Sequence, residues 1–153
     1  MLTHARLIWH LNYNKKTGKF THLVGNGRYK AGSEAGFKRG DGIGIGIAGL
    51  SFKAEDLAWM YCYGELPKGK IVHQDRDPKK NKISNLRDSG GDKPDKTIQV
   101  VKSVIRKDMG SVSVDKETGK WCVSDFIGVV KSGFETSDEA YEFAVEHFKL
   151  IRK

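Results

Sequence analysis

The sequence of 153 residues contains only two cysteines and three prolines, and it has no long hydrophobic run. Cys62 and Cys122 cannot supply a four-ligand zinc site with paired spacing, and two cysteines argue against a disulfide framework. No stretch reaches the ~18 apolar residues of a membrane-spanning helix. The first residues also lack the apolar stretch and small-residue cleavage site of a secretory signal. We therefore expect a cytoplasmic protein with no membrane partner.

Acidic residues are fewer than basic ones. The chain has 19 Asp and Glu against 27 Lys and Arg, so its formal net charge is +8. A hydrophobic fraction of 38% is enough for a compact core and excludes wholesale disorder. The length fits one medium domain or two small ones and excludes the larger α/β enzyme architectures. The positive charge favours a polyanionic partner, because each neutralised phosphate releases condensed counterions.

Residues 88–97 divide the chain into two parts. This segment contains two glycines and one proline and almost no apolar side chain, so it predicts a linker. We expect one domain over residues 1–88, a linker over 89–97 and a second domain over 98–153. The fold class that we expect is α+β, with β-hairpins and a helix in the first domain and β-rich runs before a C-terminal helix in the second.

Three segments predict β-hairpins. In residues 14–20 and again in 115–121, an Asn or Asp and a Gly bracket a tight reversal, and an aromatic residue begins the next strand. Residues 42–47 alternate Gly with Ile, a period of two that favours a β-strand with one bare face over a phosphate-binding loop. The turn at residues 48–50 then returns the chain.

Two segments predict helices. Residues 53–63 contain no Gly or Pro, and Gly64 and Pro67 follow as stop signals. Residues 136–151 begin with a capping Thr136 or Ser137 and an acidic first turn. The apolar spacing of this second helix predicts a core-facing stripe, in which the histidine has a structural role: Ala140, Phe143, Ala144, His147 and Phe148.

The segment from Leu57 to Arg87 carries an unusual combination of anchors. It begins with L-A-W-x-x-x-x-G-x-x-P, contains His73, and ends with N-x-x-x-N-L-R. Upstream, L-x-Y-N-x-x-T-G-x-F begins at Leu11 and K-A-G-x-x-A-G begins at Lys30. Over residues 7–87 the chain resembles the small phage-type homing endonucleases of the HNH family. This resemblance implies an HNH-like ββα motif and a double-stranded DNA partner.

Hydrolysis of a phosphodiester needs a base that activates water and a divalent cation that stabilises charge. The resemblance implies that His73 is this general base, and that Asn81 and Asn85 brace the loop that holds it. An imidazole titrates near neutral pH and suits that role. An alternative is that His73 is only a polar turn residue.

The sequence departs from the family at its metal ligands. The family's metal-binding Asp before the His is Val72 here, and its final Asn or His falls at Pro94. Only Asp75 and Asp77 remain as candidates for Mg²⁺, which prefers oxygen ligands, and in relatives these positions shape the turn. The His-Arg pair before L-A-W is Glu55 and Asp56. We therefore expect no cofactor and a catalytically inactive site, with Mg²⁺ required only if cleavage survives.

Residues 66–87 hold seven basic side chains against two acidic ones. This concentration predicts contacts to phosphates, and the alternative is a solvated turn. The candidates for nucleic-acid binding in this segment are Lys68, Lys70, Arg76, Lys79, Lys80, Lys82 and Arg87.

Residues 104–148 resemble the DNA-binding domain of plant ethylene-response factors, through V-S-V-D-K at 112–116, G-K-W at 119–121 and S-G-F-E-T at 132–136. The resemblance implies a three-stranded antiparallel sheet that is packed on one C-terminal helix and lies in the major groove. Strand alternation places Val112, Val114, Trp121 and Val123 toward the helix. The outer face then carries no arginine for base reading, and presents Ser111, Ser113, Lys120, Cys122, Ser124 and Lys131. Arg106, Lys107, Lys120 and Lys131 are the expected phosphate contacts.

Three functions remain open at this stage. The first is a phage DNA-binding protein that has lost cleavage and acts by regulation or occlusion. The second is an active metal-dependent endonuclease. The third is a decoy that keeps the fold and binds a host protein, such as an enzyme or a defence system.

Overall fold

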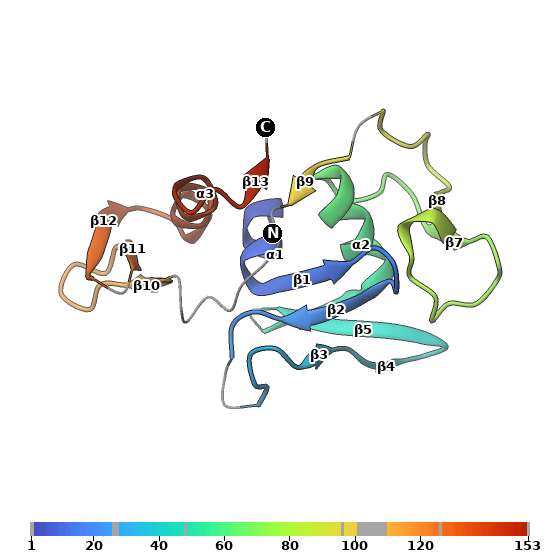
Figure 1. Ribbon diagram of the computed structural model, residues 1–153, viewed down its shortest axis with the longest axis horizontal. Helices are drawn as coiled ribbons and strands as arrows, with labels where there is room; N and C mark the ends of the chain where they lie inside the picture. The colour runs from blue at the N-terminus through green and yellow to red at the C-terminus, as the bar shows by residue number, and fades with distance from the viewer. Residues whose placement is uncertain are drawn as a thin grey trace.

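The computed structural model describes residues 2–25, 28–47, 49–95, 97–100, 110–125 and 127–152. These residues form small antiparallel sheets and helices, which confirms the α+β class (Figure 1). The helices are α1 (His4–His10), α2 (Ala54–Tyr63), η1 (Ile83–Asn85) and α3 (Ser137–His147). The strands of the first half are β1 (Leu11–Asn14), β2 (Lys19–His22), β3 (Glu34–Ala35), β4 (Phe37–Arg39), β5 (Gly42–Ile47), β6 (Leu50–Lys53), β7 (Ile71–His73) and β8 (Leu86–Asp88). The later strands are β9 (Gln99–Val100), β10 (Gly110–Val114), β11 (Trp121–Asp125), β12 (Val129–Phe134) and β13 (Ile151–Arg152).

The strands pair mostly with their sequence neighbours. The sheet orders are β1-β2-β3, β4-β5-β6, β7-β8 and β10-β11-β12, and every pair is antiparallel. The exception is β13, which pairs with β9 and so brings the C-terminal strand back beside the segment that follows the expected linker.

Both predicted turns over residues 14–20 and 115–121 are confirmed as hairpins with the same local geometry. Gly18 N–H donates to the Asn14 carbonyl at 2.7 Å, and Gly119 N–H donates to the Asp115 carbonyl at 2.8 Å. The two glycines have φ of +75° and +71°, a left-handed conformation that glycine adopts without steric cost. Trp121 begins β11 as expected, whereas β2 begins at Lys19, one residue before Phe20.

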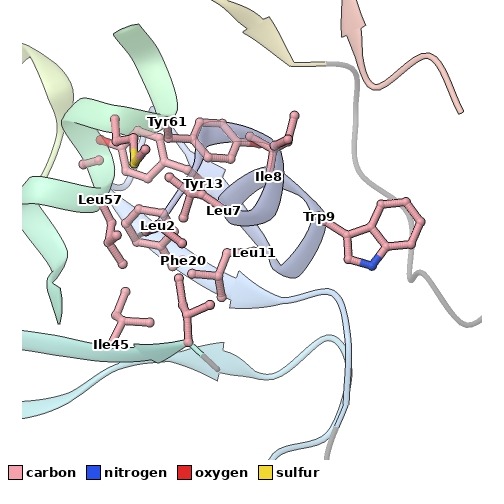
Figure 2. Packing of buried hydrophobic residues seen from close by; sticks show 14 of the residues in the cluster. Leu2, Leu7, Ile8, Trp9, Leu11, Tyr13, Phe20, Ile45, Leu57 and Tyr61 are labelled. Atoms are coloured by element: carbon pink, nitrogen blue, oxygen red, sulfur yellow. The ribbon is translucent and has the colours of Figure 1, made fainter. Parts of the chain in front are cut away.

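The helix α1 was not predicted from the sequence. It has only seven residues, and the side chain of Thr3 caps it by accepting a hydrogen bond from Arg6 N. A helix this short is marginal by itself, so its stability must come from packing. Leu7 and Ile8 are fully buried in the core that α1 forms with β1, α2 and α3, and Figure 2 shows them near Tyr13 and Tyr61.

The predicted strand at residues 42–47 and the predicted helix after it are both confirmed. Ile45 and Ile47 of β5 are buried, while the glycines leave the opposite face without side chains. Lys53 is the N-cap of α2, and Gly64 ends the helix with φ of +85°. Leu57 on this helix is fully buried in the core (Figure 2). The helix therefore holds the following loop against the main core.

The C-terminal module has the expected sheet, with β10-β11-β12 packed against α3. Val123 is fully buried, and Val112 and Trp121 pack on the core. Val114 was expected toward the helix but lies next to the turn with its side chain 43% exposed. Cys122 was expected on the outer face, yet it is buried, with its Sγ 3.5 Å from Ser113 Oγ.

The helix α3 is shorter than expected and faces the core differently. Thr136 is its N-cap and accepts from Glu139 N, as predicted, but the helix ends at His147 and Ile151 already belongs to β13. The buried residues are Ala140, Tyr141, Ala144 and Val145, so His147 lies outside the buried stripe. The stripe is rotated because α3 contacts a second element, α1, in addition to the sheet.

The two halves of the chain share one hydrophobic cluster. The Trp9 ring of α1 lies 6.4 Å from the Tyr141 ring of α3 and 5.7 Å from the Phe148 ring. This shared cluster lies between two outer parts of the molecule. Along its longest axis, the sheet β10-β11-β12 lies at one end and the β7-β8 hairpin at the other (Figure 1).

Candidate functional site

The β7-β8 hairpin presents the residues of the motif. Ile71 pairs with Asp88, Val72 with Arg87 and His73 with Leu86. Ile71 and Leu86 are buried and attach this hairpin to the core, whereas Val72 is 50% exposed. The loop over residues 74–82 and the short helix η1 connect the two strands.

The Asn81 side chain contacts the imidazole of His73, and the Tyr13 side chain in turn holds Asn81. Nε2 of His73 lies 2.8 Å from Oδ1 of Asn81, whose side chain is only 2% exposed. The hydroxyl of Tyr13 donates to the main-chain carbonyl of Asn81 at 2.5 Å. The tip of the first hairpin also touches this residue, since a Cβ on Gly18 would lie 2.5 Å from the Asn81 carbonyl carbon. Asn81 is therefore clamped by the first hairpin while it orients His73.

The expected bracing role of Asn85 matches its hydrogen bonds. Its Nδ2 donates to Oδ1 of Asp75 at 3.0 Å and to the Lys80 carbonyl at 2.8 Å, and its Oδ1 accepts from Asp75 N. Sequence reasoning did not identify Tyr13 and Gly18 as supports of the site. Their only sequence signal was the upstream Y-N-x-x-T-G pattern.

The carboxylates of Asp75 and Asp77, in the loop over residues 74–82, accept hydrogen bonds from backbone N–H groups of the same loop. Oδ1 of Asp75 accepts from Asp77 N at 2.9 Å, and Oδ1 of Asp77 accepts from Lys79 N at 3.0 Å. The backbone N–H of Asp77, followed by the Asn85 amide, holds the pKa of Asp75 below its usual value. Lys80 Nζ lies 3.9 Å from Asp75 and 4.0 Å from Asp77. Within the described ranges, no three or more His, Cys, Asp or Glu side chains form a group that could hold a metal ion.

The apex of this turn is Arg76, which has φ of +64° although it is not glycine. A left-handed conformation costs a side-chain-bearing residue energy, so the surrounding hydrogen bonds must impose it. The Arg76 N–H donates to the His73 carbonyl at 3.0 Å. The side chain itself is exposed.

A second loop is tied to the end of β8. The Asp88 carboxylate accepts hydrogen bonds from Lys68 N at 2.6 Å, Gly69 N at 2.8 Å and Gly90 N at 2.8 Å. Partial burial of this carboxylate acts to raise its pKa, but the three N–H donors lower it overall. Gly69 and Gly90 pack so closely that a Cβ on Gly69 would lie 2.6 Å from Gly90 N. The loop with Lys68 and Lys70 is therefore held beside the hairpin.

All seven basic residues that we predicted here are exposed. Among them, only Lys80 forms an ion pair within 4.0 Å in the part of the chain that the structure describes. Six cations are therefore available to an anionic partner. The seven are Lys68, Lys70, Arg76, Lys79, Lys80, Lys82 and Arg87.

The start of α2 brings negative charge near this surface. Glu55 and Asp56 lie in its first turn. Burial raises the pKa of Asp56, the neighbouring Glu55 raises it further, and Lys53 and Arg39 act in the opposite direction.

In the described residues of the C-terminal module, the two predicted phosphate contacts are engaged with other side chains. Arg106 and Lys107 lie outside the described residues. Lys120 forms an ion pair with Glu135. Lys131, which we expected on the outer face, instead has its Nζ 5.4 Å and 5.1 Å from the ring centres of Phe134 and Phe143, on the side of α3. The sheet β10-β11-β12, next to which Lys120 lies and in which Lys131 lies, is at the far end of the molecule from the β7-β8 hairpin (Figure 1).

Comparison with known protein families supports the HNH resemblance of the central segment. Residues 53–88 match the family model of the HNH endonuclease. No curated protein and no solved structure matches the chain. No helix in the described part of the chain is long and apolar enough to cross a membrane. Residues 53–88 are therefore HNH endonuclease-like.

Proposed function

We propose that this protein binds double-stranded DNA through the exposed basic surface around its HNH-like hairpin and does not cleave it. The observation that carries this proposal is that the positions near His73 offer no carboxylate oxygens that could bind a metal ion. The position of the expected metal-binding Asp is Val72, whose side chain has no oxygen atom and is half exposed. The nearest acidic residues, Asp75 and Asp77, accept hydrogen bonds within their own turn.

These residues do not fit a Mg²⁺ site. Mg²⁺ prefers nearly octahedral oxygen ligands and usually needs one or two carboxylates that face it together. Lys80 already lies beside both aspartates of the loop, and its positive charge opposes a second cation there. Phosphate binding needs none of these ligands, and seven exposed basic side chains favour it.

The biological role that fits this chemistry is occlusion or regulation of a DNA site. A protein that keeps its affinity for phosphates without hydrolysis blocks other proteins from the same duplex. The resemblance to phage-type homing endonucleases supports a role in a phage-infected cell, and the valine at the position of the expected metal ligand supports loss of cleavage.

An active endonuclease is the second candidate, and one contact favours it. When Nε2–H of His73 donates to Oδ1 of Asn81, the Nδ1 lone pair stays available to accept a proton from water. An unpaired proton acceptor on a clamped imidazole is what a general base requires. This candidate needs a cation that stabilises the leaving oxygen, and no group of three or more His, Cys, Asp or Glu side chains in the described residues could hold a metal ion for this role.

A combined binding and cleavage assay tests the proposal. Binding of a fluorescent duplex of mixed sequence is measured at two salt concentrations, and a supercoiled plasmid is incubated with Mg²⁺ or Mn²⁺. We expect binding that weakens steeply with salt, and intact plasmid. Nicking that is lost in His73→Ala would establish the second candidate. Absence of binding at low salt, with no nicking, would point instead to a protein-binding decoy.

A further inference from the structure

A groove lies beside the β7-β8 hairpin, on the side of the segment that follows β8. It has a volume of about 500 Å³ and is lined by Gln74, Arg87, Asp88, Gly91, Asp92 and Lys93. None of the observations above assigns it a role, and Gln74 and Lys93 were not among the residues predicted from the sequence. Its lining is polar and contains two cations, Arg87 and Lys93, and two carboxylates, Asp88 and Asp92. Which of these groups is free to bind a ligand decides what the groove can hold.

One of the two carboxylates already binds backbone donors of the protein. Asp88 accepts three backbone hydrogen bonds, from Lys68, Gly69 and Gly90, which stabilise its ionised form and occupy its oxygens. Arg87 and Lys93 form no ion pair within 4.0 Å with any carboxylate of the described residues, although both line the same groove as Asp88 and Asp92. The groove therefore presents two cations that form no ion pair with the residues that the structure describes.

A third cation stands at the edge of the groove. The side chain of Lys68 lies over Gly91, where a Cβ would be 3.2 Å from its Cδ and 4.0 Å from its Nζ. Glycine at position 91 thus lets the lysine stem lie flat against the chain. The side chain of Gln74 adds an amide group to the lining, and one of its two N–H donors reaches the Ser84 carbonyl at 3.3 Å. The other donor remains for a ligand.

The hairpin places this groove next to the position where the HNH resemblance expects a metal ligand. Arg87 pairs directly with Val72 across β7 and β8, so the two side chains project from the same face of the hairpin. A guanidinium offers a planar fork of donors that suits two oxygens of one phosphate, and an ammonium adds a mobile point charge.

We propose that Arg87 and Lys93, assisted by Gln74, hold one phosphate of the DNA backbone in this groove without a divalent cation. The inference rests on the proposed DNA binding and specifies where the backbone is gripped and by what chemistry. It implies that EDTA leaves the affinity for duplex unchanged, because fixed cations replace the metal ion at this point of the surface.

The test compares two double variants with equal changes in charge. Arg87→Gln with Lys93→Gln removes the two cations of the groove, and Lys30→Gln with Lys116→Gln removes two exposed cations elsewhere. Affinity for a fluorescent duplex is measured in EDTA and in Mg²⁺ across a salt series. We expect equal wild-type affinity in both buffers and a loss of ~10-fold to 100-fold in the groove variant alone. The slope of log affinity against log salt should fall by ~0.9 for one lost phosphate.

Two results overturn the inference while leaving DNA binding intact: a groove variant that binds like the control variant, or a wild type that needs Mg²⁺ to bind. If the wild type binds no duplex, the proposed function fails, and inorganic phosphate then tests the groove alone. NMR signals of the Arg87 side chain and the Gln74 amide should shift during a phosphate titration, and unchanged signals would reject the groove. Equal melting temperatures of the variants confirm folding, and Lys93→Gln alone replaces the double variant if Arg87→Gln unfolds.

Discussion

The hydroxyl of Tyr13 donates a buried hydrogen bond of 2.5 Å to the main-chain carbonyl of Asn81, which lies 68 residues later in the chain. The side chain of Asn81 in turn lies 2.8 Å from Nε2 of His73. The first hairpin of the protein is thus connected through one asparagine to the histidine of the HNH-like motif. The position of His73 depends on a strand outside the segment that matches the family model.

Replacement of Tyr13 by Phe should lower the free energy of unfolding by ~1–3 kcal/mol, because the buried Asn81 carbonyl loses its donor. Urea denaturation measures this change. Tyr63→Phe is the matched control, since the Tyr63 ring packs 4.6 Å from Trp59 and its hydroxyl makes no hydrogen bond with a described residue. Equal effects of the two substitutions would show that the contact with Asn81 contributes nothing.

Gly18→Ala and Gly119→Ala should differ although both glycines occupy the same kind of turn. Both substitutions place a side chain at positive φ, which costs ~1–3 kcal/mol. At Gly18 the new Cβ would also lie 2.4 Å from Lys82 N, whereas nothing lies within 4 Å at Gly119. We expect the larger fall in melting temperature for Gly18→Ala, and also displaced NMR signals of His73. Similar melting temperatures would contradict the close approach of the first hairpin to the loop.

The stability of the protein should fall in acid through Asp88. Its pKa is below that of an unfolded chain, near ~3.9, so its contribution is fully present above this value and is lost as the pH falls through the lower, folded pKa. Asp88→Asn should therefore be less stable than wild type at pH 7, and the difference should shrink as the pH falls toward ~3. Urea unfolding at several pH values measures it. Asp92→Asn, at an exposed position of the same segment, is the control. If the difference in stability between wild type and Asp88→Asn stays constant with pH, the charge of Asp88 is not its cause.

Removal of the negative charges at the start of α2 should strengthen DNA binding. Glu55→Gln with Asp56→Asn should raise the affinity for duplex ~2-fold to 10-fold at low salt, with a smaller effect at high salt because the interaction is screened. Fluorescence anisotropy measures both conditions. Glu142→Gln with Glu146→Gln makes the same change of charge on α3, which lies on the side of α1 away from α2 and the β7-β8 hairpin (Figure 1). An equal gain in that control would mean that only net charge matters.

Local chemistry was enough to predict several elements. The hairpins at residues 14–20 and 115–121, the helix that ends at Gly64 and the Thr136 cap were all predicted because each depends on residues a few positions apart. The strand at residues 42–47 followed from alternation of Gly and Ile. The basic surface was also recognisable, because exposed lysines and arginines cluster within one segment of the sequence.

The sequence by itself determined where the chain turns, which of its residues resemble a nuclease motif and which oxygen ligands that motif lacks. Only the tertiary structure decided that α1 forms and packs on α3, that Tyr141 rather than His147 faces the core, and that Tyr13 and Gly18 support the histidine loop. It also decided that Gln74, Arg87 and Lys93 line one groove. The reason is physical: turns and caps depend on neighbouring residues, whereas these contacts join residues far apart in the chain, and their partners become neighbours only when the common core forms.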